Sequence, residues 1–139
     1  MLMLLGRGDL AGAIAAYQLH TGNKAPEWFL KLQTVYSASG QKIGQCQEVA
    51  RTIHTAFFRL GKQPEFIAIR TQGVGNDYMT FDAAGGKALS VTRNGYHAAV
   101  RMGERVYDAF TGPAGMKMVD YLGRLHAPEG IVWKVVSEP

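Results

Sequence analysis

The change in hydrophobic periodicity near Gly61 constrains the fold more than any other feature. Before it, apolar residues recur at helical spacing, and after it they alternate as they do in strands. Helices are expected over residues 10–20, 26–36, 46–60 and 113–125, and strands over residues 66–70, 78–81, 88–92, 96–101, 105–110 and 131–136. Helices followed by an antiparallel meander predict an α+β fold, in which Asn94-Gly95 is a strong hairpin-turn signal.

A chain of 139 residues, 47% of them apolar, has room for a single core, which predicts one domain over residues 1–139. Its single cysteine excludes an internal disulfide and favours a reducing compartment. The opening Met-Leu-Met-Leu-Leu is too short for a signal peptide, and no apolar run approaches the roughly 18 residues that cross a bilayer. A membrane partner is therefore not expected.

The formal charge of +4 and the pI near 9.3 raise the question of nucleic acid. The basic residues are scattered, however, without a run and without interleaved aromatic residues. They therefore predict a solvated surface, or one that meets an acidic protein, rather than a nucleic-acid interface. The four histidines at positions 20, 54, 97 and 126 do not have the spacing of a metal motif, so no metal or other cofactor is expected.

The only cysteine, Cys46, lies where a polar, glycine-bearing loop passes into an amphipathic helix. A helix start carries unpaired backbone N–H groups and partial positive charge, which favour thiolate over thiol and can hold an oxyanion. Position and chemistry predict a nucleophile. Cys46 also heads an apolar stripe through Val49, Ile53 and Phe57, so an inert core thiol is the alternative.

Two polar residues in the strand region, His97 and Asp108, are hard to explain by packing. If residues 101–104 form a hairpin loop, these two residues stand directly opposite each other on one face. A register shifted by two residues leaves them diagonal on that face, and a shift of one residue separates them. The alternatives are a half-buried strand histidine bonded to backbone and a structural turn or edge carboxylate.

A carboxylate that faces an imidazole orients the ring and stabilises its charged form, while the other ring nitrogen faces a nucleophile. Cys46 is the one thiol available for that place. The sequence therefore predicts a Cys46, His97 and Asp108 triad for thiol-based acyl transfer.

The strings Gly44-Gln45-Cys46 at a helix start, Gly95-Tyr96-His97-Ala98-Ala99-Val100 and Arg105-Val106-Tyr107-Asp108-Ala109-Phe110 resemble the papain-like fold. At this size the chain looks most like the papain-fold toxin domains of bacterial polymorphic toxins, over roughly residues 40–110. The resemblance implies a nucleophile helix packed on an antiparallel sheet and Cys-His-Asp attack on amide bonds of a target protein. It also implies secretion or delivery as part of a larger effector, action in the target-cell cytoplasm, and a cognate immunity protein.

The resemblance extends to an oxyanion-binding glutamine a few residues before the nucleophile. Gln41 lies one residue nearer than is usual, and Gln45 abuts Cys46, so either could donate or be an ordinary loop residue. The chain is much shorter than a papain-type protease, which favours a narrow amidase or deamidase over a broad protease.

Glutamine deamidation and peptide hydrolysis are thus the expected activities, and transfer to a foreign amine by the same triad would make the protein a transglutaminase-like acyltransferase. The rival hypotheses are a nuclease toxin that uses His97, Asp108 and basic residues such as Arg101 and Arg105 on RNA, and a noncatalytic interaction module.

Overall fold

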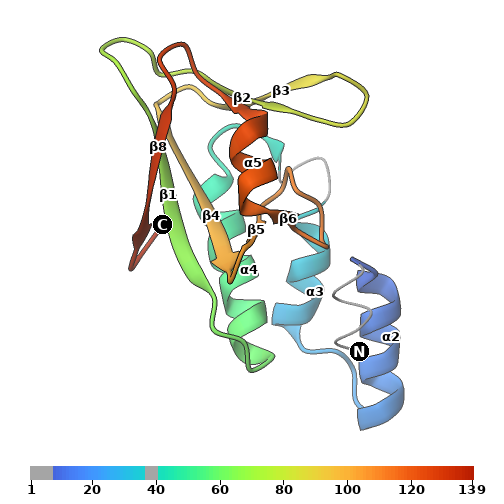
Figure 1. The fold of residues 1–139 in the computed structure, drawn as a ribbon. Coiled ribbons are helices and arrows are strands. Elements are labelled where there is room, and N and C mark those ends of the chain that lie inside the picture. Colours follow the sequence, from blue (N-terminus) through green and yellow to red (C-terminus); the bar gives the residue numbers. More distant parts are fainter. Residues whose placement is uncertain (1–7, 37–40) are drawn as a thin grey trace.

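The computed structural model describes residues 8–36 and 41–139. Its helices are α2 (Leu10–Thr21), α3 (Glu27–Thr34), α4 (Cys46–Arg59) and α5 (Met118–Arg124). Its strands are β1 (Glu65–Thr71), β2 (Met79–Asp82), β3 (Ala88–Thr92), β4 (Tyr96–Met102), β5 (Arg105–Tyr107), β6 (Met116–Lys117), β7 (Leu125–His126) and β8 (Ile131–Val136). Helices α2, α3 and α4 precede the strands and α5 lies between β6 and β7, so the α+β prediction is confirmed (Figure 1).

The first helices end where local signals place their boundaries. The Asp9 carboxylate caps α2 by accepting from the Gly12 N–H at 2.8 Å, and Gly22 ends the helix in the left-handed conformation. Helix α4 presents Val49, Ala50, Ile53 and Phe57 to the interior, as its stripe predicts. Each helix is therefore held by one apolar face rather than by propensity alone.

The strands form two antiparallel sheets instead of one meander. A five-stranded sheet has the order β6-β5-β4-β1-β8, and a three-stranded sheet has the order β3-β2-β7. Strand β1 pairs with β4 and β8, not with its sequence neighbour β2. Helix α4 lies against one face of the larger sheet, and α5 with the smaller sheet lies against the other (Figure 1).

The Asn94-Gly95 turn is not a hairpin, because β3 and β4 belong to different sheets. The Gly95 N–H donates to the Asp77 carbonyl, and the Gly95 carbonyl accepts from Thr71 N–H. The turn thus carries the chain from the smaller sheet into the larger one and sets the start of β4, two residues before His97.

Two more expectations change in detail. The helix expected over residues 113–125 is limited to α5, with β6 and β7 at its ends. The strand expected over residues 105–110 ends at Tyr107, so Asp108 follows β5 instead of lying within it.

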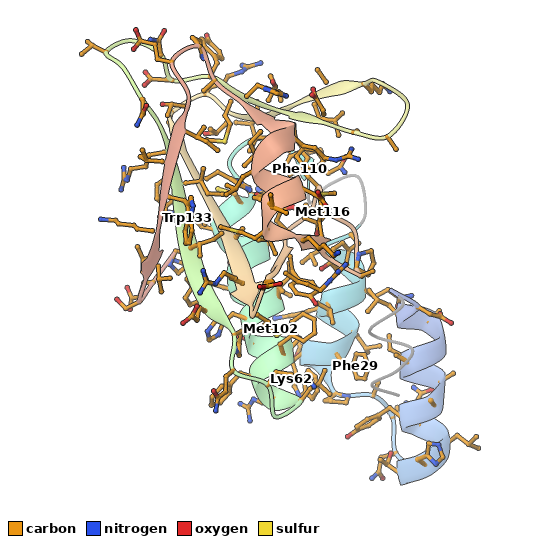
Figure 2. All side chains as sticks on the ribbon, viewed as in Figure 1. Phe29, Lys62, Met102, Phe110, Met116 and Trp133 are labelled. Carbon is orange, nitrogen blue, oxygen red and sulfur yellow. The ribbon has the colours of Figure 1, made fainter. Side chains whose placement is uncertain are left out.

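Two apolar clusters fill the layers on either side of the larger sheet. One joins Phe29 and Leu32 of α3 to α4 and to Ala98 and Val100 of β4. The other joins the opposite face of β1 and β4 to the smaller sheet and to Tyr121. Figure 2 shows Phe29 on α3, Phe110 and Met116 beside α5, and Trp133 on β8 at the sheet edge.

Candidate active site

Cys46 is the first residue of α4 and is partly exposed. Gln45, which precedes it, gives no side-chain capping bond, so the N–H groups of the first turn are open to another acceptor. The buried stripe of α4 packs this helix on β4, which fixes the position of the sulfur relative to the sheet.

His97 lies in β4 with only 1% of its surface exposed. Its Nε2–H donates to Asp108 Oδ2 over 2.8 Å. Val100 pairs with Tyr107 and Met102 with Arg105. Of the two registers that bring His97 and Asp108 onto one face, this is the one that places them diagonally. The sequence therefore correctly predicts this contact, although not the direct pairing.

Four donors hold the Asp108 carboxylate. Oδ1 accepts from the N–H groups of Phe110 at 2.8 Å and Thr111 at 2.9 Å, and Oδ2 accepts from His97 and from the Tyr121 hydroxyl, at 2.5 Å. The Asp108 N–H donates in turn to Thr111 Oγ1. Burial raises the pKa of Asp108, but the hydrogen bond and charge of His97, with help from Tyr121 and Phe110, hold it below its ordinary value.

The second ring nitrogen of His97, Nδ1, is buried and has no hydrogen-bond partner among the described residues. In the serine-protease template the carboxylate binds Nδ1 and the nucleophile binds Nε2. Here Asp108 takes Nε2, which leaves Nδ1 as the nitrogen for the thiol. His97 and Cys46 border one small cavity together with Asp108, so the structure brings the three residues together.

The pKa values of Cys46 and His97 shift in opposite directions. Burial raises the pKa of Cys46, but the neighbouring His97 imidazole with its charge and the backbone N–H groups of Ala98 and Gln47 lower it below its ordinary value. Burial lowers the pKa of His97, but Asp108 and Cys46 raise it to about 9. At neutral pH this geometry favours a thiolate beside an imidazolium.

The end of β5 leaves room for the sulfur at the sheet. Strand β5 pairs with β4 only from Val100 onward, because the chain turns at Asp108 to bind its own carboxylate. The Ala98 N–H can therefore reach the Cys46 sulfur. The thiol therefore contacts β4 at the part of the strand that β5 leaves unpaired.

Access to the sulfur is one-sided. The cavity between Cys46, His97 and Asp108 measures only about 10 Å³, which is barely room for a water molecule. On its other side Cys46 borders a groove of about 210 Å³ with Ile43, Gly44, Thr92 and Asn94. Of these two spaces beside Cys46, this groove is the one with room for more than a water molecule.

Neither Gln41 nor Gln45 lines the small cavity or the groove that Cys46 borders. The Gln41 Nε2–H donates to the Ala109 carbonyl at 3.2 Å, so its amide is engaged beside the cavity. Gln45 lines a separate groove of about 450 Å³ between α3 and α4, along with Lys31, Thr34 and Thr52. An oxyanion role for either side chain stays a prediction, and for Gln41 it requires release from Ala109.

Sequence reasoning misses Tyr121, the most deeply buried contact of Asp108. It also misses Phe110 and Thr111, whose backbone N–H groups hold the carboxylate, and the edge-to-face contact of Phe110 with His97, whose ring centres are 6.0 Å apart. An Asp followed three residues later by Thr is a local turn signal that could have found Thr111. Tyr121 has no comparable signal, because its contact is tertiary.

The described residues hold neither a metal-binding cluster nor a membrane-spanning helix. No group of three or more His, Cys, Asp or Glu side chains in residues 8–36 and 41–139 could hold a metal ion. No helix in the same part of the chain is long and apolar enough to span a bilayer.

A helix that begins at a cysteine packs on an antiparallel sheet, and a histidine of the sheet has a carboxylate beside it. This arrangement is typical of the papain-like fold. The chain belongs to the family described as Papain fold toxin 2, whose sequence model matches residues 28–126. That span contains α3 apart from its first residue, the whole of α4, both sheets apart from β8, and Cys46, His97 and Asp108. The resemblance seen in the sequence is therefore confirmed.

Comparison with curated proteins and with solved structures gave no match.

Proposed function

We propose that this papain-fold toxin domain is a cysteine-nucleophile amidase that attacks an amide bond of a target protein, either as a glutamine deamidase or as a protease. The observation that carries the proposal is the convergence of Cys46, His97 and Asp108 on one small cavity, where Asp108 binds one ring nitrogen of His97 over 2.8 Å. The pKa of His97, which Asp108 and Cys46 raise to about 9, agrees with this arrangement. A stable thiolate and imidazolium pair supplies the nucleophile and the acid that amide cleavage needs.

The reaction would run in two halves. The Cys46 thiolate adds to the amide carbonyl, and the C–N bond breaks as His97 gives its proton to the leaving ammonia or amine. A thioester remains on Cys46. Water then adds to the thioester as His97 takes its proton, the C–S bond breaks, and the carboxylic acid leaves with the thiolate restored. Asp108 steadies the imidazolium in both halves.

The oxyanion of each tetrahedral intermediate needs donors near the sulfur. The backbone N–H of Cys46 at the start of α4 is one, because α4 begins without a side-chain cap. Gln41 is the second in this proposal, after its amide leaves the Ala109 carbonyl beside the cavity. The Gln45 side chain is the weaker choice because it lines the groove between α3 and α4.

The biological setting follows from the family in outline. We propose that residues 1–139 act as one domain, that it is delivered as part of a larger effector, and that it works in the cytoplasm of the target cell. A cognate immunity protein would protect the producing cell. Family membership as a papain-fold toxin supports these proposals in general terms.

Intact-mass spectrometry of candidate target proteins after incubation tests the activity. Deamidation adds about one dalton, proteolysis gives two fragments, and acyl transfer adds the mass of the amine minus ammonia. The wild type should give one of these products, and Cys46→Ala and His97→Ala should give none. Product formation by Cys46→Ala at the wild-type rate would refute the proposal, and unchanged target masses together with salt-sensitive RNA cleavage would favour the nuclease hypothesis.

A further inference from the structure

The groove beside Cys46 continues across the face of the larger sheet. Its first part, of about 210 Å³, is bordered by Cys46, Gln47, Asn94 and Tyr96. A second, shallow part of about 570 Å³ shares Gln47, Asn94 and Tyr96 and extends over β1 and β8. The shared residues make the two parts one continuous groove, which we name the thiol groove.

The floor of the thiol groove is low where β1 places a small side chain. Ala68, which lines the groove, pairs with Ala98 of β4 on one side and with Lys134 of β8 on the other. Ala68 is buried, and its methyl group leaves a hollow between the neighbouring strands. Larger side chains therefore form the walls instead of filling the space.

The walls of the thiol groove are basic. Arg93, Arg70 and Lys134 line it, and Glu138 is the one acidic side chain among its described lining residues. The three cations are exposed, and none of them forms an ion pair with another described residue. Arg70 instead lies over the Tyr96 ring, with its guanidinium carbon 4.9 Å from the ring centre. These charges are available to a ligand.

The spacing of the strands sets the length of ligand that fits. Tyr96 pairs with Arg70, and Arg70 pairs with Val132, so the groove crosses from β4 over β1 to β8. Two strand spacings amount to roughly 10 Å, which about three extended residues cover. A chain lying in the groove with its reacting amide at Cys46 would place its next few side chains among the three cations.

We propose that the thiol groove binds a protein segment that carries Asp or Glu within about three residues of the attacked amide, with Arg93, Arg70 and Lys134 as the residues that select it. This inference rests on the proposed amidase function for its biological meaning. It explains why three cations with no ion-pair partner among the described residues line one groove beside a thiol. An acidic peptide is favoured over RNA because the ring of Tyr96, the one aromatic side chain lining the groove, is already stacked by Arg70.

Affinity labelling tests the inference without needing turnover. Short peptides that carry a chloroacetyl group at one end or the other, followed by aspartates, asparagines or lysines, differ only in charge. The saturation constant for alkylation of Cys46 should be about tenfold lower for the aspartate peptide than for the asparagine peptide at low salt. The lysine peptide should bind more weakly than both, and added salt should reduce the differences.

Charge-reversal variants test whether Arg70 and Lys134 select the acidic peptide. Lys134→Glu, on the exposed edge strand, and the double variant Arg70→Glu, Lys134→Glu should lose the preference for aspartate, and the double variant should favour the lysine peptide. Lys62→Glu makes the same charge change beyond the far end of α4 and should keep the wild-type order (Figure 2). Alkylation by neutral iodoacetamide should still go to completion in all of them, which shows that the thiol is intact.

Equal saturation constants for the three peptides in the wild type would overturn the inference, as would a preference for aspartate that survives in both reversal variants. Equal labelling combined with protection of Cys46 by a single-stranded RNA oligonucleotide would assign the groove to nucleic acid instead. Failure of the mass-spectrometric assay for amide chemistry bears only on the proposed function, because the labelling measures the groove and the thiol directly.

Discussion

The Tyr121 hydroxyl donates to Asp108 Oδ2 over 2.5 Å, and this is the same oxygen that accepts the His97 Nε2–H. Tyr121 is fully buried on α5, on the face of the larger sheet opposite α4. The position of the carboxylate thus depends on a residue of the layer opposite the helix that carries the thiol. Tyr121 is a positioning residue in this account.

Tyr121→Phe should weaken this arrangement without abolishing it. Asp108 keeps two backbone N–H donors and His97, so we expect activity to fall about tenfold, equivalent to one charge-assisted hydrogen bond. Because Tyr121 helps to lower the pKa of Asp108, that pKa should rise, and the acid limb of the pH–activity profile should move to higher pH. Tyr78→Phe, at an exposed tyrosine, is the control. An unchanged acid limb in Tyr121→Phe would contradict the role.

Asp108→Asn should remove the stabilisation of the thiolate by the His97 imidazolium. Without the carboxylate, the pKa of His97 should fall from about 9 toward or below its ordinary value, and the pKa of Cys46 should rise because the imidazolium is lost. Amide turnover should drop by about 10²–10⁴. The pH dependence of iodoacetamide alkylation measures the shift, and its midpoint should move upward.

A second histidine and aspartate pair provides the matched control for that substitution. The His126 Nε2–H lies 2.6 Å from Asp82 Oδ2 on the surface, outside the residues that line the small cavity. Asp82→Asn should leave the alkylation profile of Cys46 unchanged. Equal shifts in Asp82→Asn and Asp108→Asn would mean that the effect is a general one of charge.

The raised pKa of His97 should make the free energy of unfolding depend on pH once Cys46 is removed. In Cys46→Ala, Asp108 still holds the folded-state pKa of His97 above its unfolded value of 6.5. The stabilisation is complete below that value and is lost as the pH rises through the folded-state pKa. The free energy of unfolding should therefore fall above pH 6.5, by at most about 1.4 kcal/mol per pH unit.

Urea unfolding of Cys46→Ala at a series of pH values measures this decline. The wild type should show less of it, because the lowered pKa of Cys46 adds an opposite dependence over an overlapping range. Adding Asp108→Asn to Cys46→Ala should remove the decline. Identical curves for the single and double variants would show that Asp108 does not hold the imidazolium.

Gly95→Ala should destabilise the entry to β4. Gly95 has φ of 74°, and a Cβ there would lie 2.8 Å from Thr71 Oγ1 and 3.2 Å from Asp77 Oδ1. We expect a loss of about 1–3 kcal/mol in the free energy of unfolding, with lower activity because His97 is two residues away. Gly123→Ala, in α5 with open space around it, should instead stabilise by about 0.5–1 kcal/mol. Equal effects of the two substitutions would contradict the strain argument.

The sequence predicts elements whose ends depend on local chemistry. The cap at Asp9 and the stop at Gly61 are short-range signals, and the structure follows them. The contact of His97 with Asp108 is predictable for the same reason, since one hairpin holds both residues. The approach of Cys46 to His97 is a tertiary contact between a helix and a strand. Local signals do not predict it, so the prediction relies on the resemblance to the papain-like fold.

The pairing of the strands could not be read from the same signals. Asn94-Gly95 forms a turn as predicted, but its hydrogen bonds go to Asp77 and Thr71 because β3 has already paired with β2. Periodicity identifies strands and does not choose their partners. Likewise Asp108 lies after β5 because its carboxylate binds the Phe110 and Thr111 N–H groups, which takes the backbone out of the strand.

The ionisation of Cys46 tests the central claim most directly, because every step proposed here starts from a thiolate stabilised by His97. Ultraviolet absorbance of the thiolate can be titrated against pH in the wild type and in His97→Gln, with Cys46→Ala as the blank. The account predicts a midpoint below the ordinary value of 9.0 in the wild type and a clear rise in His97→Gln. The same midpoint, at or above 9.0, in both proteins would contradict it.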